Sequence, residues 1–119
     1  MSVEPEKLLC ILSIGHDTSC RGKGLTLRDA LSQADYANLR PLFTHSDLIP
    51  LIDAHPDLAM QWLMYSEDKR TDGGFALTEQ GAVGRRLSRG NWEWTIFSSQ
   101  AEAVANYVIL ELDFWQAIN

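Results

Sequence analysis

The 119-residue chain has only two cysteines and three histidines, and their spacing matches no familiar metal site. Cys10 and Cys20 are ten residues apart, unlike the paired ligands of a zinc knuckle, and no two histidines stand at the helical spacings of i+3 or i+4. We therefore expect no metal and no cofactor. Cys10 lies inside an apolar run, and this context predicts a small core residue.

The sequence also lacks a long apolar run and an excess of basic residues. It nowhere reaches the roughly 18 consecutive apolar residues of a membrane-spanning helix. The first apolar run follows Glu4 and Glu6 with a single Lys7, where an export signal would be basic, so we expect a cytoplasmic protein with reduced cysteines. With 10 Lys+Arg against 16 Asp+Glu and a net charge of −6, binding to nucleic acid or to an anionic membrane is disfavoured.

What remains is the composition of an ordinary globular domain. Hydrophobic residues make up 45% of the chain and charged residues 22%, a composition that argues against wholesale disorder. A chain of this length can bury a core without disulfides or metal. We expect a single domain over residues 1–119.

The first half of the chain shows helical signals. A helix is predicted over about residues 4–14 with Gly15 as its stop, although a strand is the alternative for this nearly continuous apolar run. A polar loop, "GHDTSCRGKG", should follow. Further helices are predicted from an N-cap at Thr26 to about Ala34, from Thr44 or Ser46 to about Ala54, and from Pro56 to about Lys69 and Arg70.

After Gly73 and Gly74 the apolar period changes from that of a helix to that of a strand. Alternating residues predict a three-stranded antiparallel meander with turns at "EQGA" and "SRGN". In the third strand Trp92, Trp94 and Ile96 should share one face, opposite Glu93 and Thr95, and the tryptophans are predicted to be core residues. The alternating sets in the first two strands are Phe75 and Leu77, then Val83, Arg85 and Leu87.

The last segment predicts a long and unusually apolar helix. Ser99 and Glu102 have the spacing of a capping box. The apolar face that follows is too wide for an ordinary surface helix, so we favour central burial, with a homodimer contact through this helix as the alternative. The predicted fold class is α+β: N-terminal helices, then a three-stranded antiparallel β-meander, then a long C-terminal helix packed on the sheet.

The stretch "YSEDKRTDGGF", residues 65–75, is the densest in chemically capable side chains. We favour a helix-to-strand junction, with a binding rim formed by Glu67, Asp68, Arg70 and Asp72 as the functional alternative. Catalysis is disfavoured because adjacent helical residues diverge by about 100°, so Glu67 and Asp68 would not face each other as an acid–base pair.

Two further segments carry alternatives. In the loop at 15–24 the glycine and lysine spacing fails as a phosphate-binding loop, but His16, Asp17 and Cys20 are the residue types of a thiol enzyme. A small enzyme centred on residues 16–20 or 67–72 is therefore one alternative. The other alternative is a winged-helix-like regulator that binds nucleic acid. It is suggested by three arginines beside the tryptophans of the predicted hairpin, Arg85, Arg86 and Arg89.

From these features we favour an interaction or regulatory module without catalytic activity. Its acidic surface would suit a basic protein partner, whose identity the sequence does not specify. The residues predicted to contact that partner are Glu67, Asp68, Arg70, Asp72, Trp92 and Trp94.

Overall fold

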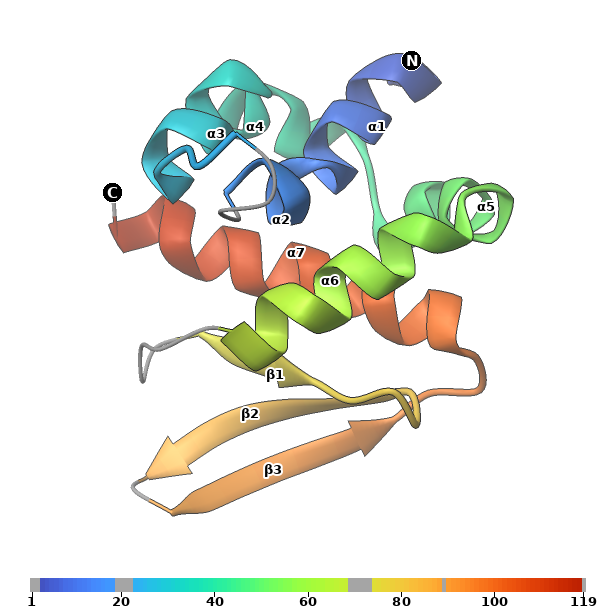
Figure 1. Ribbon diagram of the computed structural model, residues 1–119, viewed down its shortest axis with the longest axis vertical. Helices are drawn as coiled ribbons and strands as arrows, with labels where there is room; N and C mark the ends of the chain where they lie inside the picture. Colours follow the sequence, from blue (N-terminus) through green and yellow to red (C-terminus); the bar gives the residue numbers. More distant parts are fainter. Residues whose placement is uncertain (1–2, 19–22, 69–73, 89, 119) are drawn as a thin grey trace.

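The computed structural model describes residues 3–18, 23–68, 74–88 and 90–118. Helices fill the first half of the chain, a small sheet follows, and one long helix ends it (Figure 1). The sheet is antiparallel with strand order β1-β2-β3. In chain order the elements are α1 (Pro5–Leu12), α2 (Ile14–Asp17), α3 (Leu27–Gln33), α4 (Tyr36–Leu39), the 3-10 helix η1 (Arg40–Leu42), α5 (His45–Ala54), α6 (Pro56–Asp68), β1 (Phe75–Leu77), β2 (Ala82–Ser88), β3 (Asn91–Ile96) and α7 (Gln100–Ile118).

The long helix α7 lies at the centre of the molecule. Figure 1 shows it running between the N-terminal helices and the sheet, and it contacts α3, α5 and α6 as well as β1 and β2. This central position explains why the apolar face of α7 is so wide, because opposite sides of the helix pack against other elements. The predicted α+β class, with the C-terminal helix packed on the sheet, is confirmed. Nine of its residues are buried: Ala101, Ala103, Val104, Ala105, Tyr107, Val108, Ile109, Glu111 and Leu112.

The N-terminal segment differs from the prediction in two ways. The first helix ends at Leu12, and Gly15 does not stop it but lies buried inside the short helix α2. A Cβ atom on Gly15 would lie 3.0 Å from the Trp62 ring, so the glycine here allows close packing of that ring and does not form a turn. Cys10 is exposed, because α1 buries Leu8, Ile11 and Leu12 on its opposite face.

The helix starts expected at Thr26 and Pro56 are confirmed, and of the two starts considered for the helix between them, Thr44 and Ser46, the cap is Thr44. The Thr26 hydroxyl accepts a hydrogen bond from the Asp29 amide at 3.1 Å, and Thr44 forms a capping box with Asp47. Ser99 likewise accepts from the Glu102 amide at 3.1 Å ahead of α7, but the Glu102 carboxylate accepts from the Ser98 hydroxyl at 3.0 Å, so only the Ser99 half of the expected capping box is seen among the described residues. Because each cap is a local interaction, it can be recognised from sequence alone.

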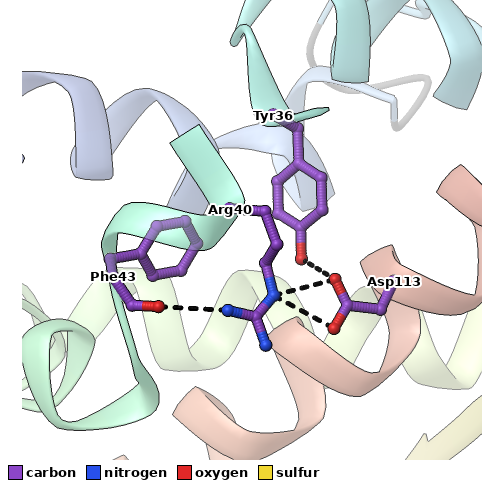
Figure 2. Close-up of polar contacts among 4 residues, drawn as sticks. All are labelled: Tyr36, Arg40, Phe43 and Asp113. Carbon is purple, nitrogen blue, oxygen red and sulfur yellow. Dashed lines mark hydrogen bonds and ion pairs between the residues drawn. The ribbon is translucent and has the colours of Figure 1, made fainter. Parts of the chain in front are cut away.

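The turn formed by α4 and η1 was not predicted, and it is tied to α7 by a polar cluster. Figure 2 shows Tyr36 and Arg40 converging on the carboxylate of Asp113. The Tyr36 hydroxyl donates to Oδ1 of Asp113 at 2.6 Å, and Arg40 Nε lies 2.9 and 3.0 Å from its two oxygens. Arg40 also donates through Nη1 to the Phe43 carbonyl at 3.0 Å and lies over the Phe43 ring. These contacts fix the α4–η1 turn against the C-terminal half of α7.

The meander has the expected alternation, but the prediction that its tryptophans are core residues is wrong. Leu77 and Val83 are buried on the face toward α7, and their register places Thr95 on that same face. Trp92, Trp94 and Ile96 therefore point to the opposite face, away from the helices. Each lies on the outer face beside a cross-strand partner from β2, namely Arg86, Gly84 and Ala82 respectively.

In the described ranges, no helix has the length and hydrophobicity needed to cross a membrane.

Candidate functional site

The outer face of the sheet carries an exposed aromatic surface. Trp92 is 41% exposed, Trp94 48% and Ile96 79%, and all three come from the same side of β3. The two indole rings are stacked, with centroids 5.8 Å apart and an angle of 24° between their planes. We call these three residues the tryptophan face. Large side chains clustered in this way on a strand are typical of a surface that contacts another molecule.

The position of Trp94 depends on a glycine in the neighbouring strand. A Cβ atom on Gly84 would lie 2.7 Å from the Trp94 ring, so the indole lies directly over the backbone of β2. Gly84 is buried although it faces outward, which shows that the ring covers it. The tryptophan face is thus held against the sheet on one side and open on the other.

The inner face of the sheet forms an open groove of about 570 Å³ with the C-terminal half of α7. Its walls are mainly aromatic and aliphatic, with the inner-face residues Arg85 and Glu93 among them; Arg86, which the register places on the outer face, also borders the groove. Arg85 stands opposite Glu93 across the two strands, so opposite charges are neighbours there. The lining residues are Gly74, Phe75, Val83, Arg85, Arg86, Glu93, Thr95, Phe97, Leu110 and Phe114.

The segment 65–75 is a helix-to-strand junction, as predicted, since α6 ends at Asp68 and β1 begins at Phe75. Both ends of the junction bind one buried carboxylate. Glu111 accepts a hydrogen bond from the Tyr65 hydroxyl at 2.9 Å and one from the Phe75 amide at 2.8 Å. The Trp115 indole donates to the same carboxylate at 2.7 Å. Glu111 is completely buried, and burying a carboxylate without partners would cost a large amount of free energy. These three hydrogen bonds offset that cost.

Three tyrosines surround this carboxylate and the Asp113 cluster. Burial, together with the nearby negative charge of Glu111, raises the pKa of Tyr65 and of Tyr107 well above the usual value. Burial and the hydrogen bond to Asp113 raise the pKa of Tyr36 in the same way. All three phenols are therefore neutral in the folded protein at ordinary pH.

The predicted partner-binding residues fall on two separate parts of the fold. Glu67 and Asp68 are exposed at the end of α6, whereas Trp92 and Trp94 lie on the outer face of β3. Arg70 and Asp72 lie outside the described residues. The helix-to-strand prediction is thus confirmed, and the role of these residues as a binding rim stays a prediction.

The two alternative sites are only partly described. His16 and Asp17 belong to α2 rather than to a loop, and the Asp17 carbonyl accepts from the Leu25 amide at 3.0 Å; Cys20 lies outside the described residues. Within the part of the chain that the structure describes, no three His, Cys, Asp or Glu side chains gather in a way that could hold a metal. Arg85 and Arg86 have cross-strand partners of different kinds, Glu93 and Trp92, and Arg89 also lies outside the described residues.

The sequence analysis did not identify Glu111, Asp113 or Arg40 as structurally important. Glu111 and Asp113 stand as two acids inside the apolar stretch "VILELDFW", and an acid in such a context is the signal that could have marked them. Tyr65 is 46 residues away from Glu111 along the chain, and Arg40 is 73 residues away from Asp113. Local spacing in the sequence could therefore not reveal these pairs.

Comparisons of the chain with protein-family models, with curated proteins and with solved structures found no match.

Proposed function

We propose that this protein is an interaction module that binds another protein through the tryptophan face. The observation that carries the proposal is the stacked, half-exposed pair of Trp92 and Trp94 on the outer face of the sheet. Tryptophan contributes large contact area at low cost in side-chain entropy, and it is enriched among the residues that dominate binding energies. The proposal assigns a binding role and no reaction.

The net charge of the chain indicates what kind of partner surface it would attract. The chain has a net charge of −6, so a partner with a basic rim around an apolar centre would be attracted. Glu67 and Asp68, exposed at the end of α6, are the charged positions we would test as peripheral contacts. Their expected effect is on the association rate, because exposed charges are screened by salt and contribute little to the final affinity.

Site-specific photo-crosslinking tests the proposal and captures the partner in the same experiment. A benzophenone amino acid would replace Ile96 on the tryptophan face or, as the matched control, Met60 on α6; these side chains are 79% and 59% exposed. We expect discrete products with another protein from position 96 that are absent from position 60. Adding Trp92→Gln to the position-96 protein should remove them.

The contradicting results are equally definite. Equal products from positions 96 and 60, or products that persist with Trp92→Gln, would show that the tryptophan face is not the binding surface. Once a partner is captured, Trp92→Ala should weaken its affinity by at least about tenfold, while Glu67→Gln should change it by less than about threefold.

A further inference from the structure

Strand β3 is an open edge of the sheet. The strand order is β1-β2-β3, and α6 and α7 both contact β1, whereas Figure 1 shows β3 as the element farthest from the helices. Natural edge strands are usually protected by proline, by a bulge or by charged side chains, including charges that point inward. The stretch Asn91–Ile96 contains neither lysine nor proline, and the register irregularity falls between Arg86 and Ser88, toward the hairpin end. Its one charged residue, Glu93, faces inward opposite Arg85, so any strand that pairs with this edge must do so in a register that accommodates this carboxylate.

The hydrogen-bond pattern shows which backbone groups the edge offers. The Phe97 amide donates to the Gly81 carbonyl at 2.9 Å, in line with the β2–β3 register. Since bonded and non-bonded pairs alternate in an antiparallel ladder, Glu93 and Thr95 also direct their backbone groups toward β2. The backbone groups of Trp92, Trp94 and Ile96 then point outward, away from β2. The residues of the tryptophan face are also the ones with available edge groups.

We propose that a second copy of this chain pairs with the β3 edge, and that the twofold axis relating the two copies passes between their Trp94 residues. In this antiparallel register Trp94 pairs with its own counterpart, and Trp92 pairs with Ile96 of the other copy. Every outward-pointing amide then faces an outward-pointing carbonyl, which gives about six hydrogen bonds between the copies. The edge is complementary to itself in backbone as well as in side chains.

Charge favours this register over its neighbour. With Trp94 on the axis, Glu93 stands opposite Thr95 of the other copy, so two carboxylates do not meet. A register centred on Glu93 would instead place that carboxylate opposite itself, and like charges in directly opposed positions destabilise a sheet. Centring on Trp92 or Ile96 would leave the far end of the six-residue strand without a partner.

The arrangement of the helices leaves room for the second copy. A twofold axis perpendicular to the sheet keeps both helical layers on the same side of a joined six-stranded sheet. Because α7 contacts β1 and β2 and the helices lie away from β3, the two layers would stand apart (Figure 1). The interface is small and each copy carries a net charge of −6, so we expect a weak dimer, with a dissociation constant roughly in the micromolar range, that tightens as salt screens the repulsion.

Pairing would enlarge the surface of the proposed function. The tryptophan faces of both copies would lie side by side on the outer side of the joined sheet, forming one continuous apolar surface across the axis. The inference goes beyond the proposed function, because edge pairing requires no other protein. It also predicts that a partner able to contact both copies binds the dimer more tightly than the monomer.

Charge changes at Thr95 test the pairing without altering the tryptophan face. Thr95 is exposed and its side chain points to the opposite side of the sheet from Trp94. Thr95→Lys would place a cation opposite Glu93 of the other copy, twice per dimer, and should lower the dissociation constant about tenfold; Thr95→Glu should raise it about tenfold. Sedimentation equilibrium provides the measurement. A wild-type chain that stays monomeric at about 1 mM would overturn the inference.

Engineered cysteines test the register itself. In a Cys10→Ser, Cys20→Ser background, proteins carrying Glu93→Cys and Thr95→Cys should crosslink by disulfide when mixed, while neither should crosslink with itself. A non-bonded antiparallel pair has Cα atoms about 4.5 Å apart, within disulfide range. Self-crosslinking of the Glu93→Cys protein would contradict the Trp94 axis, and a dimer insensitive to both Thr95 charges would place the contact elsewhere.

The two proposals can fail separately. A captured partner with an unchanging monomer would uphold the proposed function and reject edge pairing. A dimer with the stated charge response, together with failure of the photo-crosslinking test at position 96 toward other proteins, would do the reverse.

Discussion

At the scale of single residues, one buried carboxylate organises the junction that the sequence marks as unusual. Glu111 receives hydrogen bonds from Tyr65, from the Phe75 amide and from Trp115, so it joins the end of α6 to the start of β1. The junction between these elements is thereby anchored at both of its ends. Tyr65 and Phe75, which flank the charge-rich segment, thus bind a common residue that lies 36 positions farther along the chain from Phe75.

We predict that Glu111→Ala lowers the free energy of unfolding by about 3 to 5 kcal/mol, because it leaves three partly buried donors without their acceptor and opens a space at a fully buried position. Glu111→Gln should cost less, about 1 to 3 kcal/mol, since its amide nitrogen must still face one of those donors. Urea denaturation checks both values. Glu67→Ala is the matched control on the exposed end of α6, and it should change stability by less than about 0.5 kcal/mol. Equal effects at the two positions would rule out the role assigned to Glu111.

Tyr65 and Tyr107 offer a second comparison around the same carboxylate. The Tyr65 hydroxyl donates to Glu111, whereas the buried Tyr107 hydroxyl makes no hydrogen bond of good geometry among the described residues, and the nearby Ser66 side chain lowers its pKa without offsetting the effect of burial. Tyr65→Phe should therefore lower the free energy of unfolding by about 1 to 2 kcal/mol, and Tyr107→Phe should leave it unchanged or slightly raise it. Denaturation curves of the two variants decide this, and the reverse order of stabilities would contradict the hydrogen-bond assignment.

At the scale of elements, the sequence predicts what depends on local signals. The caps at Thr26, Thr44 and Ser99 and the alternation of the meander are visible as short patterns, and the structure confirms them. Which face of the meander meets α7 is a different matter. Trp92 and Trp94 are the largest apolar residues of β3, yet the register with Val83 and Leu77 turns the other face inward. A property set by three strands and a helix together cannot be derived from one strand.

The same reasoning explains the two corrected assignments near the N-terminus. Gly15 has the sequence context of a helix stop, but it serves as a contact point for Trp62, which lies 47 positions farther along the chain. Cys10 belongs to an apolar run, but an eight-residue amphipathic helix can bury only one side of that run. Long-range packing decides both positions.

Two glycine substitutions test how these close contacts differ. Trp62 is fully buried and its indole donates to the Leu12 carbonyl at 2.8 Å, so the ring cannot move away from a new methyl group. Gly15→Ala should cost about 1 to 3 kcal/mol of unfolding free energy. Trp94 is half-exposed and can move, so Gly84→Ala should cost less, about 1 kcal/mol or below.

The second substitution has its own optical readout. By displacing Trp94 it should weaken the coupled circular-dichroism signal expected from the stacked Trp92–Trp94 pair. A Gly84→Ala protein with an unchanged tryptophan signal would contradict the placement of Trp94 over β2.

At the scale of the whole molecule, the three tyrosines predict the response to alkaline pH. They are all the tyrosines of the chain, and the folded protein raises the pKa of each above its ordinary value of about 10. Their contribution to stability is therefore fully present below about pH 10 and is lost as the pH rises further, by about 1.4 kcal/mol per pH unit for each tyrosine.

Ultraviolet titration checks this expectation. The folded protein should show almost no tyrosinate absorbance just above pH 10, and all three phenols should ionise together when the protein unfolds in alkali. Gradual ionisation of a tyrosine while the tertiary circular-dichroism signal stays intact would contradict the burial of that side chain.

The central claim for the whole molecule is that β3 carries the interaction surface and is an open edge until another strand covers it. Amide hydrogen exchange, read residue by residue in dilute and in concentrated samples, tests this most directly. In dilute solution the amides of Glu93, Thr95 and Phe97 should be protected while those of Trp92, Trp94 and Ile96 exchange quickly, and in concentrated solution the second set should become protected. Fast exchange of Trp92, Trp94 and Ile96 at both concentrations would contradict edge pairing, and their protection at both would contradict an open edge.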